Sequence, residues 1–176
     1  MSPDRFDPPS QRRQVTVAAG GGFISTLPAA VSFDSAFSFM LIRGGHLDMT
    51  VLGGLEVDAN ERLANWMVPG KLVPGMGGAM DLVAGARRVI VAMQHTARGR
   101  SKIVPKLTLP PTAERPVSLV VTDLAVLHST PDGLMLQERA PGVSVAEIIA
   151  ATAAPLLIAD DVPEMGSVVA EPVMVS

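Results

Sequence analysis

The sequence predicts an α/β fold with an open, mixed, largely parallel sheet flanked by helices. Short apolar, β-branched segments such as residues 87–93 alternate with helical patterns and glycine turns, an order typical of strands that are connected by helices. The turn Pro131-Asp132-Gly133 lies between two apolar runs, so we expect one antiparallel hairpin in the sheet. The chain has 176 residues, 48% of them apolar, which corresponds to one domain within the usual range of about 100–200 residues.

Composition divides the chain into three parts. Residues 1–14 are rich in proline and charge without an apolar period, so we expect a disordered leader. Residues 15–158 carry the strand and helix patterns of the domain. Residues 159–176 form an acidic tail rich in methionine and valine.

The first predicted helix spans residues 35–43. Asp34 is a candidate N-cap, and a Gly-Gly pair follows the helix as a stop signal. Apolar residues spaced i, i+3 and i+4 share one face of this helix, which we expect to be buried. The residues of that face are Phe37, Met40 and Leu41, with Phe33 and Phe39 as possible additions to the same core.

The remaining elements are mostly short strands. We expect them at residues 15–17, 23–27, 48–52, 55–57, 64–68, 87–93, 117–121, 124–128 and 134–138. The strand at 48–52 is apolar enough to be buried, whereas residues 96–102 are polar and basic and predict a loop. Ser144 and Glu147 have the spacing of a capping box for a helix at 145–154, which Pro155 ends.

Charge and composition exclude several classes of function. A net charge of −3, with one Trp and no Tyr, argues against a nucleic-acid partner. No Cys is present, so disulfides and thiolate metal sites are excluded. His46, His95 and His128 lack the spacing of metal ligands, and we expect no metal. Without a signal peptide or membrane span, we expect a soluble cytoplasmic protein.

A glycine-rich stretch at residues 69–78 precedes a predicted helical turn at 79–84. It fails the P-loop pattern, because Asn65 replaces the first glycine and Leu72 follows the lysine, and it fails the dinucleotide fingerprint at Met80. Glycines at a helix start present backbone N–H groups to a phosphate, carboxylate or oxyanion. A tight surface turn explains the same residues. The candidate site residues are Gly75, Met76, Gly77, Gly78 and Ala79.

Several motifs resemble the B subunit of 3-oxoacid CoA-transferases, a family that includes the succinyl-CoA, acetate–acetoacetate and 3-oxoadipate enzymes. They are the segments at residues 33–36, 42–48, 63–71, 75–83 and 122–126, in the family's order, within a resemblance from about residue 19 to about residue 157. The resemblance implies an open α/β fold and a hetero-oligomer with an A subunit. It also implies transfer of coenzyme A, as a substrate and not a permanently bound cofactor, between carboxylic acids.

The same resemblance implies a glutamate nucleophile in a Ser-Glu-Asn-Gly motif, upstream of the matching segment. No glutamate of this chain precedes Asn-Gly; they are Glu56, Glu61, Glu114, Glu138, Glu147, Glu164 and Glu171. We therefore predict no catalytic residue here, and an inactive isolated chain. We expect that the segment with the nucleophile is lost, removed by a late translation start, or encoded elsewhere. A sheet without its first strands would have an unpaired edge strand. The alternative function is a non-catalytic CoA-binding or assembly fragment.

Other polar residues are weaker candidates. Glu56 is the carboxylate nearest the glycine loop in sequence, although a solvated strand end explains it better. Lys71 is a candidate phosphate contact or a solvated lysine. His95 follows Gln94, where the family commonly has Glu-His, and Asp34-Ser35 suits an N-cap better than a catalytic triad. We interpret a basic cluster as a solvated loop, and contact with a CoA phosphate is the less favoured alternative. The members of the cluster are Arg98, Arg100, Lys102 and Lys106.

Overall fold

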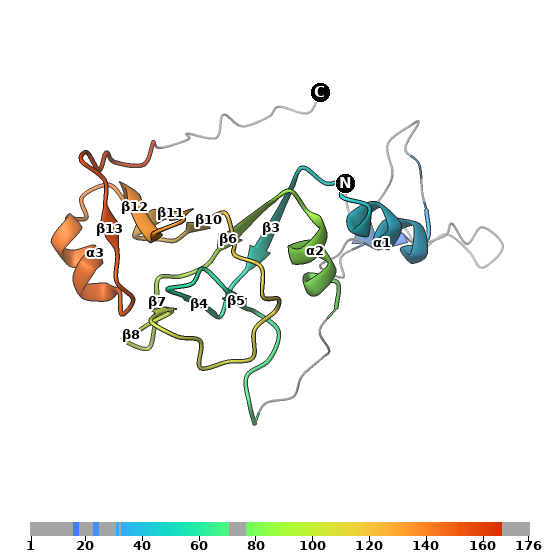
Figure 1. Ribbon diagram of the computed structural model, residues 1–176, viewed down its shortest axis with the longest axis horizontal. Helices are drawn as coiled ribbons and strands as arrows, with labels where there is room; N and C mark the ends of the chain where they lie inside the picture. The colour runs from blue at the N-terminus through green and yellow to red at the C-terminus, as the bar shows by residue number, and fades with distance from the viewer. Residues whose placement is uncertain (1–15, 18–22, 25–30, 32, 71–76, 167–176) are drawn as a thin grey trace. The chain divides into compact units, whose positions relative to one another are not determined.

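The computed structural model describes residues 16–17, 23–24, 31, 33–70 and 77–166 (Figure 1). The chain divides into two compact units, Met1–Asp34 and Ser35–Ser176. In the first unit, β1 (Thr16–Val17) pairs antiparallel with β2 (Phe23–Ile24). Both strands lie within segments predicted to be extended.

The second unit contains a mixed sheet with the order β13-β12-β11-β10-β6-β3. The strands are β3 (Met49–Gly53), β6 (Arg88–Ala92), β10 (Leu119–Val121), β11 (Ala125–Thr130), β12 (Gly133–Arg139) and β13 (Leu157–Ile158). β6 is parallel to β3 and β10, β13 is parallel to β12, and β11 is antiparallel to both of its neighbours. The predicted fold class and the predicted hairpin are confirmed.

Two small sheets accompany the main one. β4 (Glu56–Asp58) pairs with β5 (Leu63–Ala64) and β9 (Ile103–Val104). β7 (Thr96–Ala97) and β8 (Arg100–Ser101) form a hairpin where we expected a loop. Arg98 (φ 53°) and Gly99 (φ 72°) form its turn, with the positive φ angles that suit the right-handed twist of a two-residue hairpin.

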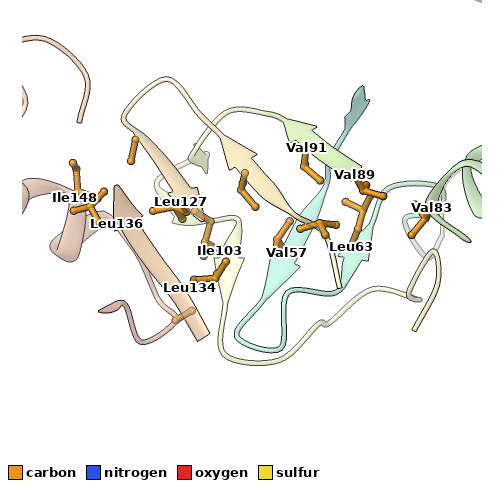
Figure 2. Packing of buried hydrophobic residues seen from close by; sticks show 14 residues of the cluster. Val57, Leu63, Val83, Val89, Val91, Ile103, Leu127, Leu134, Leu136 and Ile148 are labelled. Carbon is orange, nitrogen blue, oxygen red and sulfur yellow. The ribbon is translucent and has the colours of Figure 1, made fainter. Parts of the chain in front are cut away.

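One core joins the main sheet to β4, β5 and β9 (Figure 2). The strands alternate as a half-buried sheet requires: Val89 and Val91 of β6 are fully buried, whereas Arg88 and Ala92 are exposed. Figure 2 shows buried side chains from the other strands in the same core; they are Val57, Leu63, Ile103, Leu127, Leu134 and Leu136.

The helices are α1 (Ser35–Arg43), α2 (Ala79–Gly85) and α3 (Val145–Ala151). The capping box at α3 is confirmed, with Ser144 and Glu147 bonded reciprocally. α3 ends at Ala151 and not at residue 154 as predicted, because Thr152 is extended (ψ 125°). Its hydroxyl donates to the Ile148 carbonyl and contacts His95 Nε2.

The predicted buried face of α1 is wrong. Phe37 is 45% exposed and Met40 61% exposed, whereas Ile42 is buried. α1 meets α2 through Ile42 instead, because Gly85 lets the two backbones approach. A Cβ at Gly85 would lie 2.1 Å from the Ile42 carbonyl oxygen. Phe33 is also exposed, and Phe39 is half-buried.

The expectation of a buried strand at 48–52 is also wrong. Within β3 only Thr50 is buried, whereas Met49 is 48% and Val51 60% exposed. In the described part of the chain β3 is an edge of the main sheet. This location accounts for the exposure, because an edge strand has fewer neighbours to cover its side chains.

Candidate functional site

The described part of the glycine loop leads directly into α2. Gly77 has φ +57°, and Gly78 precedes the helix without a side-chain cap. The first N–H groups of a helix have no intrahelical partner, so this end presents backbone donors beside residues that have no side chain. Gly77, Gly78 and Ala79 are described, whereas Gly75, Met76 and Lys71 lie outside the described residues.

α1 forms a wall beside these donors. The Phe39 ring packs on Gly78, where an added Cβ would lie 3.2 Å from the ring carbon Cε1. An open cavity of about 730 Å³ runs along this side of α1, lined by Ser35, Ala36, Phe39, Met40, Arg43 and Gly44. Phe39 therefore contacts both the cavity and the start of α2.

Arg43 supplies a positive charge to the cavity. Its Nε donates to Asp81 Oδ1 at 2.7 Å, and its guanidinium lies 5.6 Å from the centre of the Phe39 ring. The bond to Asp81 raises the pKa of Arg43 above its ordinary value, so the side chain stays cationic. Sequence reasoning used Arg43 only as part of a matching motif and did not select it as a site residue.

The far end of α2 is held by Arg115. Its Nη1 donates to the carbonyls of Val83, Ala84 and Ala86, and its Nη2 donates to the Arg87 carbonyl at 2.8 Å. A cation at a helix C-terminus offsets the partial negative charge of the unpaired carbonyls. Arg115 thus helps to position the helix whose other end carries the glycine loop.

Glu56 is anchored and has no reactive geometry. Its carboxylate accepts bonds from Thr108 Oγ1 at 2.6 Å and Thr108 N at 2.8 Å, with Leu109 N at 3.3 Å. A carboxylate that accepts several bonds is a poor nucleophile, because its lone pairs are engaged. Glu56 therefore fastens the 108–109 loop to β4, and it is neither a free strand-end charge nor an attacking group.

The three histidines lie apart. His46 is exposed beside Gly44, and His128 is exposed on β11. His95 is fully buried, with Nδ1 3.0 Å from Thr122 Oγ1 and Nε2 2.9 Å from Thr152 Oγ1. Burial lowers the pKa of His95, so the neutral ring links the segment after β6 to the β10–β11 turn and to the residue that follows α3. In the described ranges, no group of three or more His, Cys, Asp or Glu side chains is placed to hold a metal ion.

The basic cluster is not uniformly solvated. Arg98, Arg100 and Lys106 are exposed as expected. Lys102 is half-buried, and its Nζ donates to the Gly54 carbonyl at 2.7 Å. Burial lowers the pKa of this amine. Lys102 therefore ties the end of β3 to β9, and the expectation of a solvated side chain was wrong for it.

The chain matches the Coenzyme A transferase family over residues 1–151, a span that includes the segment 1–14. It is 55% identical, over 91% of its length and 72% of the relative, to the beta subunit of the acetate CoA-transferase from Haemophilus influenzae. It is 47% identical, over 75% of its length and 64% of the relative, to the B subunit of the succinyl-CoA:3-ketoacid coenzyme A transferase from Helicobacter pylori.

A solved structure supports the fold. The acyl-CoA transferase YdiF of Escherichia coli O157:H7 superposes with a TM-score of 0.71 and 25% identity, over 85% of this chain and 33% of that chain. The chain thus spans about a third of that protein and about two thirds to three quarters of the curated relatives. In the residues that the structure describes, no helix has the length and apolar character needed to cross a membrane.

Proposed function

The chain belongs to the coenzyme A transferase family, and from that premise we propose that it is the B subunit of an enzyme that moves CoA from an acyl-CoA to a free carboxylic acid. The observation that carries the proposal is the 55% identity to a protein named for this activity, over 91% of the chain. The α1–α2 site is chemically suited to it, because it combines backbone donors, a cation and an apolar wall.

We assign the donors at the start of α2 to the tetrahedral oxyanion. When a carboxylate attacks a thioester carbonyl, negative charge develops on the carbonyl oxygen, and positioned N–H groups stabilise that charge. In the proposed mechanism the first attack gives a mixed anhydride and releases CoA thiolate. The thiolate returns to the glutamyl carbonyl and displaces the donor carboxylate, which gives a glutamyl-CoA thioester. The acceptor carboxylate attacks this thioester and releases CoA thiolate, and attack of the thiolate on the acceptor acyl group of the new anhydride gives the product acyl-CoA and frees the glutamate. We assign the loop of Gly75, Met76, Gly77, Gly78 and Ala79 to these steps and propose Lys71 as a CoA-phosphate contact.

We further propose that the attacking carboxylate is none of the described glutamates. Glu56 is held by Thr108, Glu147 caps α3, and Glu164 pairs with Arg139 at 2.7 Å. Glu114 pairs with Arg62, and Glu61 is buried in a different groove. Glu138 lies on β12, which three strands separate from β3 in the main sheet. These engagements favour an attacker that is supplied from outside the described residues.

An A-type subunit is the proposed partner. Both curated relatives are named as one of the subunits of an enzyme, beta or B. Large apolar side chains are exposed on α1 and β3 beside the candidate site; they are Phe37, Met40, Met49 and Val51. Exposed apolar residues along an edge strand suit association with another chain.

The proposed acceptor is a short-chain acid, either acetate or a 3-oxoacid. The identity is 55% to the relative named for acetate and 47% to the relative named for 3-ketoacids, which favours the smaller acid. Acetate and acetoacetate should therefore be compared side by side as acceptors.

The test is a CoA-transfer assay with the chain alone, with a co-expressed A-type subunit from the same genome, and with that subunit plus a supplied Ser-Glu-Asn-Gly segment. We expect no transfer from acetyl-CoA or succinyl-CoA by the chain alone, because removal of a nucleophile typically costs several orders of magnitude in rate. In an active complex, Arg43→Gln should lower kcat/KM about tenfold or more, while the exposed Arg98→Gln should not. Turnover by the isolated chain that is lost in Glu56→Ala, or a CoA ester on one of its glutamates, would refute the assignment.

The second candidate is a non-catalytic protein that binds CoA or serves in assembly. The observation in its favour is that no glutamate of the chain precedes Asn-Gly. The two functions separate in one experiment: a complex that binds CoA but transfers none, even with a supplied Ser-Glu-Asn-Gly segment, supports the second. Transfer that depends on both the A-type subunit and that segment supports the first.

A further inference from the structure

An open groove of about 430 Å³ lies between the β4–β5 turn and the β10–β11 strands. The residues that give it chemistry are Glu61, Arg115, Ser118, His128, Ser129 and Thr130. Arg115 lines this groove while it holds the C-terminal end of α2, whereas the glycine loop precedes the N-terminal end. The groove is therefore separate from the candidate active site.

The backbone holds Glu61 firmly in this groove. Its N–H donates to the Asp58 carbonyl at 2.8 Å, and its own carbonyl accepts from Val117 N at 2.8 Å. Its φ of 60° lies in the left-handed region, which is uncommon for a residue other than glycine, asparagine or aspartate. The chain thus keeps a glutamate in a strained conformation, and the residue is only 9% exposed.

Two buried polar atoms of the groove lack a hydrogen-bond partner among the described residues. They are Glu61 Oε1 and Ser129 Oγ. An interaction with the Thr130 backbone lowers the pKa of the Glu61 carboxyl in part, against the effect of burial. A buried polar atom without a partner is unfavourable and rare. Two such atoms in one groove indicate that a group outside the described residues completes them.

The missing group must be a hydrogen-bond donor, because a carboxylate oxygen only accepts. The neighbouring cations are already used: Arg62 pairs with Asp58 at 2.8 Å, and Arg115 binds carbonyls. A guanidinium prefers to bind both carboxylate oxygens, whereas only Oε1 of Glu61 is a buried oxygen without a partner. An ammonium group is a compact point charge with three donors and needs only one oxygen. The described residues offer no set of metal ligands.

We propose that this groove binds a primary ammonium group, with Glu61 Oε1 as its charged acceptor and Ser129 Oγ as its second acceptor. Either a free small amine or the side chain of a lysine in another protein presents this group. The proposal does not depend on the transferase reaction, and either can fail without the other.

The pH dependence of binding follows from the same contacts. Burial raises the pKa of the Glu61 carboxyl, and the nearby Asp58 acts in the same direction. The exposed His128 opposes this shift, and Arg62 neutralises Asp58. Because only the ionised carboxylate attracts an ammonium ion, affinity should fall as the pH is lowered through the raised pKa.

The test is a titration of the full chain with methylammonium chloride at constant ionic strength. Binding is followed by calorimetry and by the backbone amide signals of Ser129 and Thr130. Tetramethylammonium is the matched control, since it has the same charge but no N–H donor. We expect saturable binding of methylammonium with shifts confined to the groove, and no comparable shifts with tetramethylammonium.

Matched variants locate the site. Glu61→Gln keeps the shape of the side chain and should weaken binding at least tenfold, because a charge-assisted bond is lost. Ser129→Ala should weaken it less, and the exposed Glu114→Gln should not change it. Should Glu61→Gln fail to fold, Ser129→Ala and the amide shifts of the unaltered chain decide the question. Equal response to the two ammonium ions, no saturable binding, or binding unchanged in both groove variants would overturn the proposal.

A last pair of probes identifies the source of the amine. Nα-acetyl-lysine amide carries the ammonium as a protein does, whereas 1,4-diaminobutane is a free amine. Tighter binding of the lysine probe assigns the groove to a protein partner. Tighter binding of the diamine assigns it to a small metabolite.

Discussion

The region of α1, α2 and β3 and the region of β10, β11, β12 and α3 are packed in opposite ways. In the second region the inward residues of each strand are fully buried, as Leu127, Leu134 and Leu136 show. In the first region, Met40 is 61% exposed and Val51 is 60% exposed, and α1 and α2 approach each other at a glycine. The second region forms a well-packed core, whereas the first leaves apolar surface and backbone donors available to a ligand or a partner chain. Stability and the proposed chemistry therefore lie in different parts of the unit.

The largest effect on the free energy of unfolding should come from the well-packed region of β10, β11, β12 and α3. Leu127→Ala removes a fully buried side chain between β10 and β12 and should lower the free energy of unfolding by about 2–5 kcal/mol. The matched control is Val51→Ala on the open region, where we expect a change within about 0.5 kcal/mol. Urea unfolding measures both. Equal losses in the two variants would show that the contrast between the regions is false.

An intermediate effect is expected at the junction of α1 and α2. In Gly85→Ala the new Cβ would overlap the Ile42 carbonyl, so the helices must separate, at a cost of about 1–3 kcal/mol. Gly53→Ala is the control, because an added Cβ there meets no atom within 4 Å. Chemical denaturation compares the two variants, and the transfer assay shows whether separation also impairs the site. A Gly85→Ala protein as stable as the control would mean that the helices do not approach as closely as described.

The smallest effect should be the change in the free energy of unfolding with pH. Burial lowers the pKa of His95 below its ordinary value of 6.5. Below about pH 6.5 the unfolded chain takes up a proton that the folded chain resists, so His95 reduces stability as the pH falls. Glu61 acts in the opposite direction, because its raised pKa makes the folded state bind the proton more readily.

A substitution of His95 isolates the contribution of this residue to the pH dependence. The slope of unfolding free energy between pH 7 and pH 5 should become less positive in His95→Gln than in the unaltered chain. Denaturant titrations at several pH values measure this. Identical slopes in the two proteins would contradict a buried neutral His95.

Sequence reasoning identified the candidate site only in part. The start of α2 after Gly78 and the hairpin turn at Pro131 were predictable, because both depend on local backbone preferences. Arg43 was missed as a site residue, although it lies inside a matching motif. Its role depends on Asp81, 38 residues away along the chain, and no local pattern indicates such a pairing.

By itself, the sequence determined the family, the class of fold and the approximate positions of the longer elements, since motifs, periodicity and caps such as Ser144 with Glu147 act over a few residues. Only the tertiary structure decided which face of α1 is buried, that β3 lies at an edge, and that Glu61 is enclosed. The reason is physical: burial depends on which distant segments meet. The close approach at Gly85 and the bond from Val117 to Glu61 join residues that are far apart in the chain.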